Sequence, residues 1–148
     1  MKEVVILGAG YAGLRALHVL QGAKGDFHIT LVDKNDYHYE ATDLHEVAAG
    51  TQPRERISYD IADVVRPQKT TFLQNEVATI DRQSQRIMFT DQTSLSYDYL
   101  IVALGFESES FGIPGVNENA LEMVDVDSAE TIYHHLLKQM KEYKKTQD

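Results

Sequence analysis

Short apolar runs alternate with polar turns along this chain. Runs rich in apolar residues occupy positions 4–7, 27–32 and 99–105, and each is followed by a polar or glycine-containing turn. Runs of this length predict strands, and those without polar alternation predict strands buried on both faces. A leucine recurs at every third position across residues 14–20, which predicts a helix. The order strand, helix, strand is typical of a parallel sheet built from βαβ units.

The apolar pattern changes between residues 70 and 98. Runs with β-branched and aromatic residues at 71–73, 76–80 and 86–90 predict strands separated by short polar turns. We expect a small antiparallel meander over about 70–98, carried on the main sheet. The predicted fold class is therefore α/β, a Rossmann-like parallel sheet with an inserted small antiparallel β meander.

Two helices are predicted between the second strand and the meander. The first begins near Asp43, has Thr42 as its cap and ends at Gly50. The second has a weaker apolar stripe, with Ser58 as its cap and Pro67 as its end.

A last helix is predicted near the C-terminus. Asp127 and Glu130 have the spacing of a reciprocal capping box. Four lysines near its end read as a solvated face that complements the helix dipole, namely Lys138, Lys141, Lys144 and Lys145. Its predicted apolar face comprises Ile132, Tyr133, Leu136, Leu137, Met140 and Tyr143.

The turn after the first strand carries the candidate chemistry. Gly8, Gly10 and Gly13 form a G-x-G-x-x-G run, and Asp33 follows Gly13 by 20 residues at the end of the second strand. In this fingerprint the first glycine makes a tight turn, the second lets a pyrophosphate approach, and the third packs the helix against the strand. The helix N-terminus favours phosphate, and the acid accepts hydrogen bonds from a ribose. The sequence predicts a dinucleotide-binding site.

The composition excludes several classes of binding partner and of reactive site. The 148 residues carry a net charge of −9, which disfavours nucleic acid and anionic lipid. Cysteine is absent, which excludes disulfides, thiolate metal sites and a cysteine nucleophile and is typical of a cytoplasmic protein. No apolar run approaches the roughly 18 residues of a membrane span, and we expect no signal peptide.

Titratable residues cluster at His38, Asp43, His45 and Glu46. Histidine and carboxylate are metal-ligand types, but these residues form no H-x-x-x-H or H-x-x-x-E pair. We therefore predict no metal site.

Three stretches of the sequence resemble the N-terminal FAD-binding part of type II NADH dehydrogenases, which are flavoproteins with two dinucleotide domains. They are GAGYAGL at 8–14, NDYHYEATDLHEVAAG at 35–50 and YDYLIVALGFESESFGIPG at 97–115. The resemblance implies an FAD-binding domain over 1–115. Residues 116–148 would form a loop and helix that lead towards an NADH-binding domain absent from this chain.

The resemblance also implies the cofactor-binding residues. FAD would lie on the glycine turn, with Asp33, in place of a glutamate common in relatives, on the adenosine ribose. Thr42 would lie towards the isoalloxazine, and Val77 would meet the adenine through its backbone. No catalytic acid or base is expected, because the flavin carries the chemistry; His45 and Glu46 are candidates for tuning it or plain surface residues. The predicted set is Gly8, Ala9, Gly10, Tyr11, Ala12, Gly13, Asp33, Lys34, Asn35, Thr42, Val77, Ala103 and Gly105.

The resemblance implies that the full-length protein transfers a hydride from NADH to FAD and electrons to a quinone at the cytoplasmic face of the membrane. This chain would be its FAD-binding half, inactive alone and prone to self-association through the face that meets the absent domain.

Two alternatives stay open. The chain is a non-catalytic dinucleotide-binding module, or it is a single-domain NAD(P)-dependent dehydrogenase. The second requires a Tyr-x-x-x-Lys pair, and no lysine follows Tyr37, Tyr97, Tyr99 or Tyr133 at that spacing.

Overall fold

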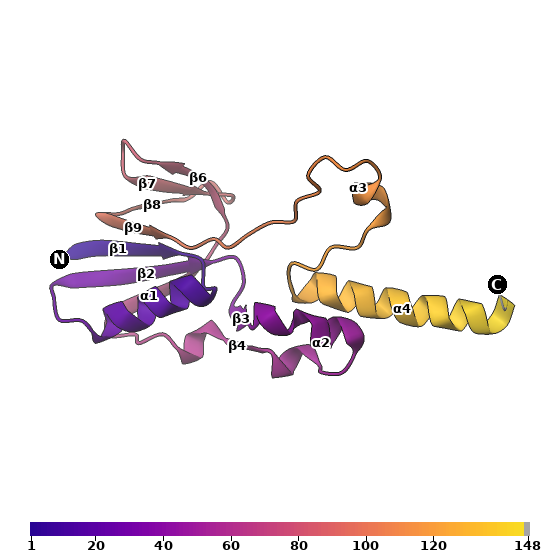
Figure 1. Cartoon of the computed structure of the whole chain (residues 1–148). Coiled ribbons are helices and arrows are strands. Elements are labelled where there is room, and N and C mark those ends of the chain that lie inside the picture. The colour runs from indigo at the N-terminus through magenta and orange to yellow at the C-terminus, as the bar shows by residue number, and fades with distance from the viewer. Residues whose placement is uncertain (147–148) are drawn as a thin grey trace. The chain divides into compact units, whose positions relative to one another are not determined.

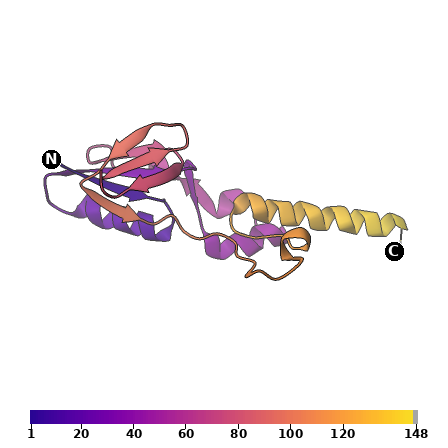
Figure 2. The same ribbon diagram turned by 90° about the horizontal axis from the view of Figure 1, so that it is seen from above.

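The structure is a computed structural model that describes residues 1–146. The chain forms two compact units. The first unit comprises Met1–His38 and Tyr59–Gly105, and the second comprises Tyr39–Ser58 and Phe106–Asp148. Figure 1 labels the elements, and Figure 2 shows the same ribbon turned by 90°.

A four-stranded parallel sheet forms the centre of the first unit. Its order is β5 (Thr70–Gln74), β2 (Phe27–Asp33), β1 (Lys2–Leu7) and β9 (Tyr99–Val102). Helix α1 (Tyr11–Gly22) connects β1 to β2, as the leucine spacing predicts. The predicted Rossmann-like α/β fold is confirmed.

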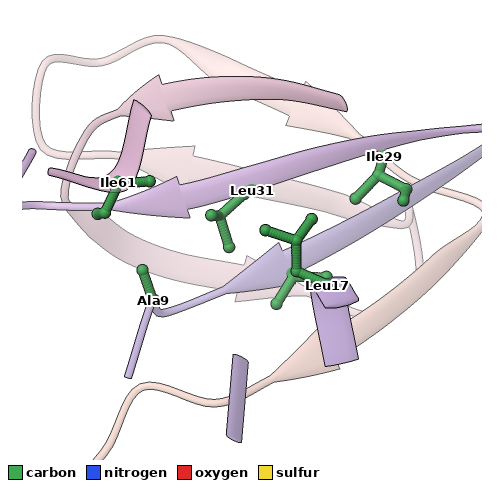
Figure 3. Packing of buried hydrophobic residues seen from close by; sticks show 6 residues of the cluster. Ala9, Leu17, Ile29, Leu31 and Ile61 are labelled. Atoms are coloured by element: carbon green, nitrogen blue, oxygen red, sulfur yellow. The ribbon is translucent and has the colours of Figure 1, made fainter. Parts of the chain in front are cut away.

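Apolar residues of β1 and β2 pack on both faces of this sheet. Leu17 of α1 packs with Ile29 and Leu31 on one face, and their side chains lie together in Figure 3. Val5 and Val32 pack on the other face, with residues of the meander. Figures 1 and 2 both place α1 and the meander on opposite sides of the sheet. Burial on both faces explains the apolar composition of the two central strands.

The antiparallel meander is confirmed, with two changes to its strands. It consists of β6 (Val77–Asp81), β7 (Arg86–Phe89) and β8 (Ser94–Ser96), in that order. The run at 71–73, expected in the meander, belongs instead to β5 and pairs in parallel with β2. Strand β8 was not among the predicted strands, because its sequence Ser-Leu-Ser contains a single apolar residue.

Strand β9 differs from the predicted fully buried strand. Tyr99 and Val102 are 60% and 58% exposed, because β9 is an edge strand of the four-stranded sheet. An edge strand lacks a neighbour on one side, so its apolar composition does not imply complete burial.

Short elements occupy the segment between β2 and β5. Strands β3 (Tyr37–Tyr39) and β4 (Ser58–Asp60) form a two-stranded sheet. The 3-10 turns are η1 (Ala41–Asp43), η2 (Arg54–Arg56) and η3 (Ile61–Asp63).

The predicted helix from Ser58 to Pro67 is wrong. Ser58 begins strand β4, and η3 follows it. Ile57 and Ile61 are both buried at helical spacing, but the chain buries them from either end of a short strand. Spacing alone does not separate these two arrangements.

Helix α2 (Leu44–Ala49) lies in the second unit and ends at Gly50, as predicted, in a left-handed conformation. Thr42 is not its cap, because it lies inside η1 and Asp43 takes the cap position. The chain enters α2 through a 3-10 turn, which shifts the start of the helix by one residue.

The second unit also contains α3 (Val116–Asn119) and α4 (Val126–Thr146). The capping box of α4 lies two residues before the predicted one. The Ser128 N–H donates to Asp125 Oδ1 at 2.8 Å, and the Asp125 N–H donates to Ser128 Oγ at 3.0 Å. Glu130 instead pairs with Arg54 Nη1 at 2.9 Å.

The predicted apolar face of α4 is only partly covered. Its members Ile132, Tyr133 and Leu137 are partly buried, whereas Leu136, Met140 and Tyr143 are 49–62% exposed. Among residues 1–146, no helix is both long and apolar enough to cross a membrane.

Candidate functional site

The turn after β1 is held between the ends of two neighbouring strands. The Gly8 N–H donates to the Val32 carbonyl oxygen at 2.7 Å, and the Ala103 N–H donates to the Leu7 carbonyl oxygen at 2.8 Å. Gly8 has a φ of +97°, and a Cβ added to it would lie 2.1 Å from the Ala103 carbonyl oxygen. The fold itself therefore requires glycine at position 8.

Gly13 brings α1 close to this turn. A Cβ on Gly13 would lie 1.8 Å from the Gly8 carbonyl oxygen. The first and third glycines thus serve backbone packing, as the fingerprint predicts.

Gly10 differs from the other two glycines of the motif in its conformation and its packing. Its φ is −73°, and nothing lies within 4 Å of a Cβ added to it. Neither backbone conformation nor packing within the described chain requires glycine there. Gly10, Tyr11 and Ala12 are exposed, whereas Gly8, Ala9 and Gly13 are buried. The motif therefore presents open backbone at its second glycine.

Gly10 is also the N-cap of α1. It contributes no side-chain cap, and the first turn of the helix contains no acidic residue. The partial positive charge of the helix N-terminus is therefore not offset by an acidic side chain in the first turn and favours an anion.

Asp33 lies beside this turn at the end of β2. Its Oδ2 accepts from the Ala9 N–H at 2.6 Å, and its Oδ1 accepts from the Asn35 N–H at 2.9 Å. A carboxylate has about four lone-pair sites, so each oxygen retains capacity for a further donor. The carboxylate is thereby fixed in orientation next to the glycine turn.

Several other predicted residues of the first unit lie around the same strand ends. The Asn75 N–H donates to the Asp33 carbonyl oxygen at 2.9 Å, which places the start of β6, at Val77, near the end of β2. Gln74 Nε2 donates to the Lys34 carbonyl oxygen at 3.2 Å. Ala103 borders Gly8, and Gly105 is exposed two residues further on. The carboxyl ends of β1, β2 and β9 thus bring together the glycine turn, Asp33 and Ala103.

Thr42 belongs to the second unit. It is exposed in η1, and its carbonyl oxygen accepts from His45 Nδ1 at 3.1 Å. His45 Nε2 lies 3.7 Å from Glu46 Oε1 on α2. Their roles near a flavin stay predictions.

His38 is a residue that the sequence reasoning did not assign to the turn. It is 4% exposed, and its Nδ1 lies 2.7 Å from the Ala9 carbonyl oxygen. The Tyr11 and Tyr59 rings lie 5.4 and 4.9 Å from its ring. Within residues 1–146 no three His, Asp or Glu side chains are grouped to hold a metal ion. No local sequence signal connects His38 to Ala9, because their contact depends on the fold.

A profile of the pyridine nucleotide-disulphide oxidoreductase family matches residues 2–145. The chain belongs to this family. The predicted resemblance is confirmed by curated relatives as well. The type II NADH:quinone oxidoreductase of Staphylococcus aureus is 44% identical over 137 residues, which cover 91% of this chain and 34% of that protein.

Solved structures share the fold of this chain. NDH2 from Plasmodium falciparum, in complex with NADH, has a TM-score of 0.85 at 25% identity over 97% of this chain and 30% of its own. The sulfide:quinone oxidoreductase of Aquifex aeolicus has a TM-score of 0.84 at 25% identity over 95% of this chain and 33% of its own. The chain thus spans about a third of the length of the relatives it matches.

Members of a disulphide oxidoreductase family are named for a redox-active cysteine pair. This sequence contains no cysteine. Thiol–disulfide exchange by cysteine is therefore not a chemistry that these residues perform.

Proposed function

We propose that this chain is the FAD-binding half of a flavin-dependent NADH dehydrogenase, and that the longer protein transfers electrons from NADH to a quinone. Family membership and the names of the relatives support this function. The structural observation that carries it is the open space at Gly10. Gly22 also has open space, but Gly10 lies at the N-terminus of α1, next to Ala9, which Asp33 holds, and a pyrophosphate can approach the backbone there.

The residues present fit the ADP portion of FAD. The exposed backbone at Gly10, at the N-terminus of α1, would bind the pyrophosphate, because backbone N–H groups and the helix dipole favour anions there. Asp33 would accept hydrogen bonds from the adenosine ribose through its remaining lone pairs. The adenosine would lie along Lys34, Asn35 and the Val77 backbone.

The flavin, when bound, supplies the hydride and electron-transfer chemistry. The contribution of this chain is to bind and orient it. Ala103 and Gly105 would border the turn, and Thr42 would lie towards the isoalloxazine. No side chain of this chain is assigned as a catalytic acid or base.

The partners of the longer protein follow from the same proposal. NADH would bind a second domain outside this chain, and a quinone at the cytoplasmic face of the membrane would accept the electrons. Nucleic acid is not among the proposed partners, since the net charge of −9 repels phosphate. This proposal is preferred to a single-domain NAD(P)-dependent dehydrogenase because the relatives are about three times as long as the chain.

The test is FAD titration of the wild type, Gly10→Val and Gly22→Val, followed by visible absorption after desalting. Gly22 is the matched control, because it lies at the other end of α1 and also has nothing within 4 Å of an added Cβ. We expect the wild type and Gly22→Val to bind FAD, and Gly10→Val to lose binding while keeping its thermal midpoint.

The same titration is repeated on a chain extended through the following domain. Absence of FAD binding by both wild-type chains would contradict the proposed function. Binding by the extended chain alone would show that the site is completed by later residues.

A further inference from the structure

The peptide groups on either side of Ala9 are held by two different side chains. The Ala9 N–H donates to Asp33 Oδ2 at 2.6 Å, and the Ala9 carbonyl oxygen lies 2.7 Å from His38 Nδ1. A carbonyl oxygen can only accept, so Nδ1 carries the proton in this contact. Ala9 is 2% exposed, and its hydrogen bond with His38 is buried.

The bond from His38 fixes the peptide that joins Ala9 to Gly10. The structure contains no cis peptide bond among the described residues, so the carbonyl and N–H of this peptide point in opposite directions. The Ala9 carbonyl points inward to the buried imidazole. The Gly10 N–H is therefore directed the other way, at the residue where the backbone is exposed and open.

We propose that His38 is a positioning residue for the phosphate-binding turn: its Nδ1–H holds the Ala9–Gly10 peptide so that the Gly10 N–H is aimed at the pyrophosphate of the dinucleotide. This inference rests on the proposed function, because it assigns a positioning role within the same site. It assigns a role in this site to a residue that is neither part of the glycine motif nor the acid at the end of β2.

The imidazole is itself held in place. The Tyr11 ring meets it edge-on, with an interplanar angle of 72°, and the Tyr59 ring meets it at 43° from β4. Packing between two aromatic rings restricts rotation of the imidazole. The turn is thus ordered before any ligand arrives, and a preorganised site loses less entropy on binding.

A buried histidine that merely fills the core would contribute to stability without affecting the ligand. The test therefore compares His38→Asn with His38→Leu and His38→Gln. The Asn amide nitrogen is attached at the same position along the side chain as His Nδ1, so Asn can donate to Ala9, whereas Leu has no donor and Gln carries its donor one carbon further out.

Two quantities are measured for each variant. The first is the affinity for FAD, in the extended chain if that form is needed for binding. The second is the ³¹P NMR shift of the bound pyrophosphate at saturating FAD, which responds to the donors around the phosphates and not to global stability.

We expect His38→Leu and His38→Gln to weaken FAD by about tenfold, the effect of one hydrogen bond, and to move the ³¹P shift. His38→Asn should restore both quantities towards the wild type. If His38→Leu does not fold, the FAD affinities and ³¹P shifts of His38→Asn and His38→Gln are compared instead. These two side chains differ by a single methylene, so a difference between the variants tests the position of the donor.

Wild-type affinity and an unchanged ³¹P shift in His38→Leu or in His38→Gln would overturn the role of His38 and leave the proposed function intact. A wild-type protein that binds no FAD in either length would overturn the proposed function, and the role of His38 with it.

Discussion

Gly13 lies so close to Gly8 that a Cβ on Gly13 would be 1.8 Å from the Gly8 carbonyl oxygen. The obstacle is backbone, which cannot move aside as a flexible side chain can. We expect Gly13→Ala to lower the free energy of unfolding by about 1–3 kcal/mol, despite the higher helix propensity of alanine. Urea denaturation followed by circular dichroism measures this loss. Gly22→Ala, on the same helix with open space around it, is the control and should not destabilise.

Asp33 is expected to bind a ribose as well as the Ala9 N–H. The probe is ADP, the half of FAD that would contact this unit, compared with 2′-deoxy-ADP. Loss of a charge-assisted hydrogen bond should weaken binding of the deoxy ligand to the wild type by about 1–3 kcal/mol. In Asp33→Ala the two ligands should bind equally, because the group that distinguishes them is gone.

The neighbouring Asp36 provides the control for this comparison. It is exposed, and Asp36→Ala should preserve the preference for ADP. A preference for ADP that persists in Asp33→Ala would refute the ribose assignment, whatever the change in overall affinity.

The glycine turn was predictable because its signals are local. Gly8, Gly10 and Gly13 follow a strand and open a helix, and Asp33 ends the next strand. Each of these features is readable in sequence order, and their meeting follows from the geometry of a βαβ unit.

The contact between His38 and Ala9 was not predictable in this way. The residues are 29 apart, and they meet only because β3 folds back beside the turn. Histidine in a polar stretch has no pattern that points to a buried partner. The helix expected at Ser58 failed for a related reason, since two buried isoleucines at helical spacing also fit a strand between two turns.

Asp98 joins the start of β9 to β1, and we expect it to make the stability of the fold depend on pH. The Lys2 ammonium at 2.7 Å, and then the Glu3 N–H at 2.8 Å, lower the pKa of Asp98 from its ordinary value. A lowered carboxyl pKa stabilises the fold above the unfolded-state value of about 3.9, and this contribution is lost as the pH falls through the folded-state pKa. We expect Asp98→Asn to reduce the difference in urea midpoint between about pH 6 and pH 2.5.

The partner variant tests the cause of this pKa shift. Lys2→Met removes the main source of the lowered pKa of Asp98. Like Asp98→Asn, it should reduce the pH dependence of the urea midpoint. An unaltered pH dependence in both variants would show that this carboxyl does not contribute to acid unfolding.

The capping box of α4 depends on Ser128 rather than on Glu130. Ser128→Ala removes the acceptor of the Asp125 N–H and should cost about 1 kcal/mol in the free energy of unfolding. Thr131→Ala is the matched control, because the Thr131 hydroxyl donates to a helix carbonyl at 2.9 Å and caps no N–H group. Thermal denaturation followed by far-UV circular dichroism compares the two variants. Equal losses would mean that the capping box contributes nothing specific.

Helix α4 exposes Leu136, Met140 and Tyr143 along the stripe that was expected to be covered. Exposed apolar side chains at helical spacing favour association with a second apolar surface. We expect the chain to self-associate with increasing concentration, as measured by sedimentation velocity, and the triple variant Leu136→Gln, Met140→Gln, Tyr143→Gln to stay monomeric over the same range. The control replaces residues of the same helix that are already polar, Lys138→Gln and Lys141→Gln, and should associate like the wild type. Since the triple variant leaves the glycine turn intact, it should keep the FAD affinity of the wild type. A wild-type chain that is monomeric throughout would show that these side chains drive no self-association.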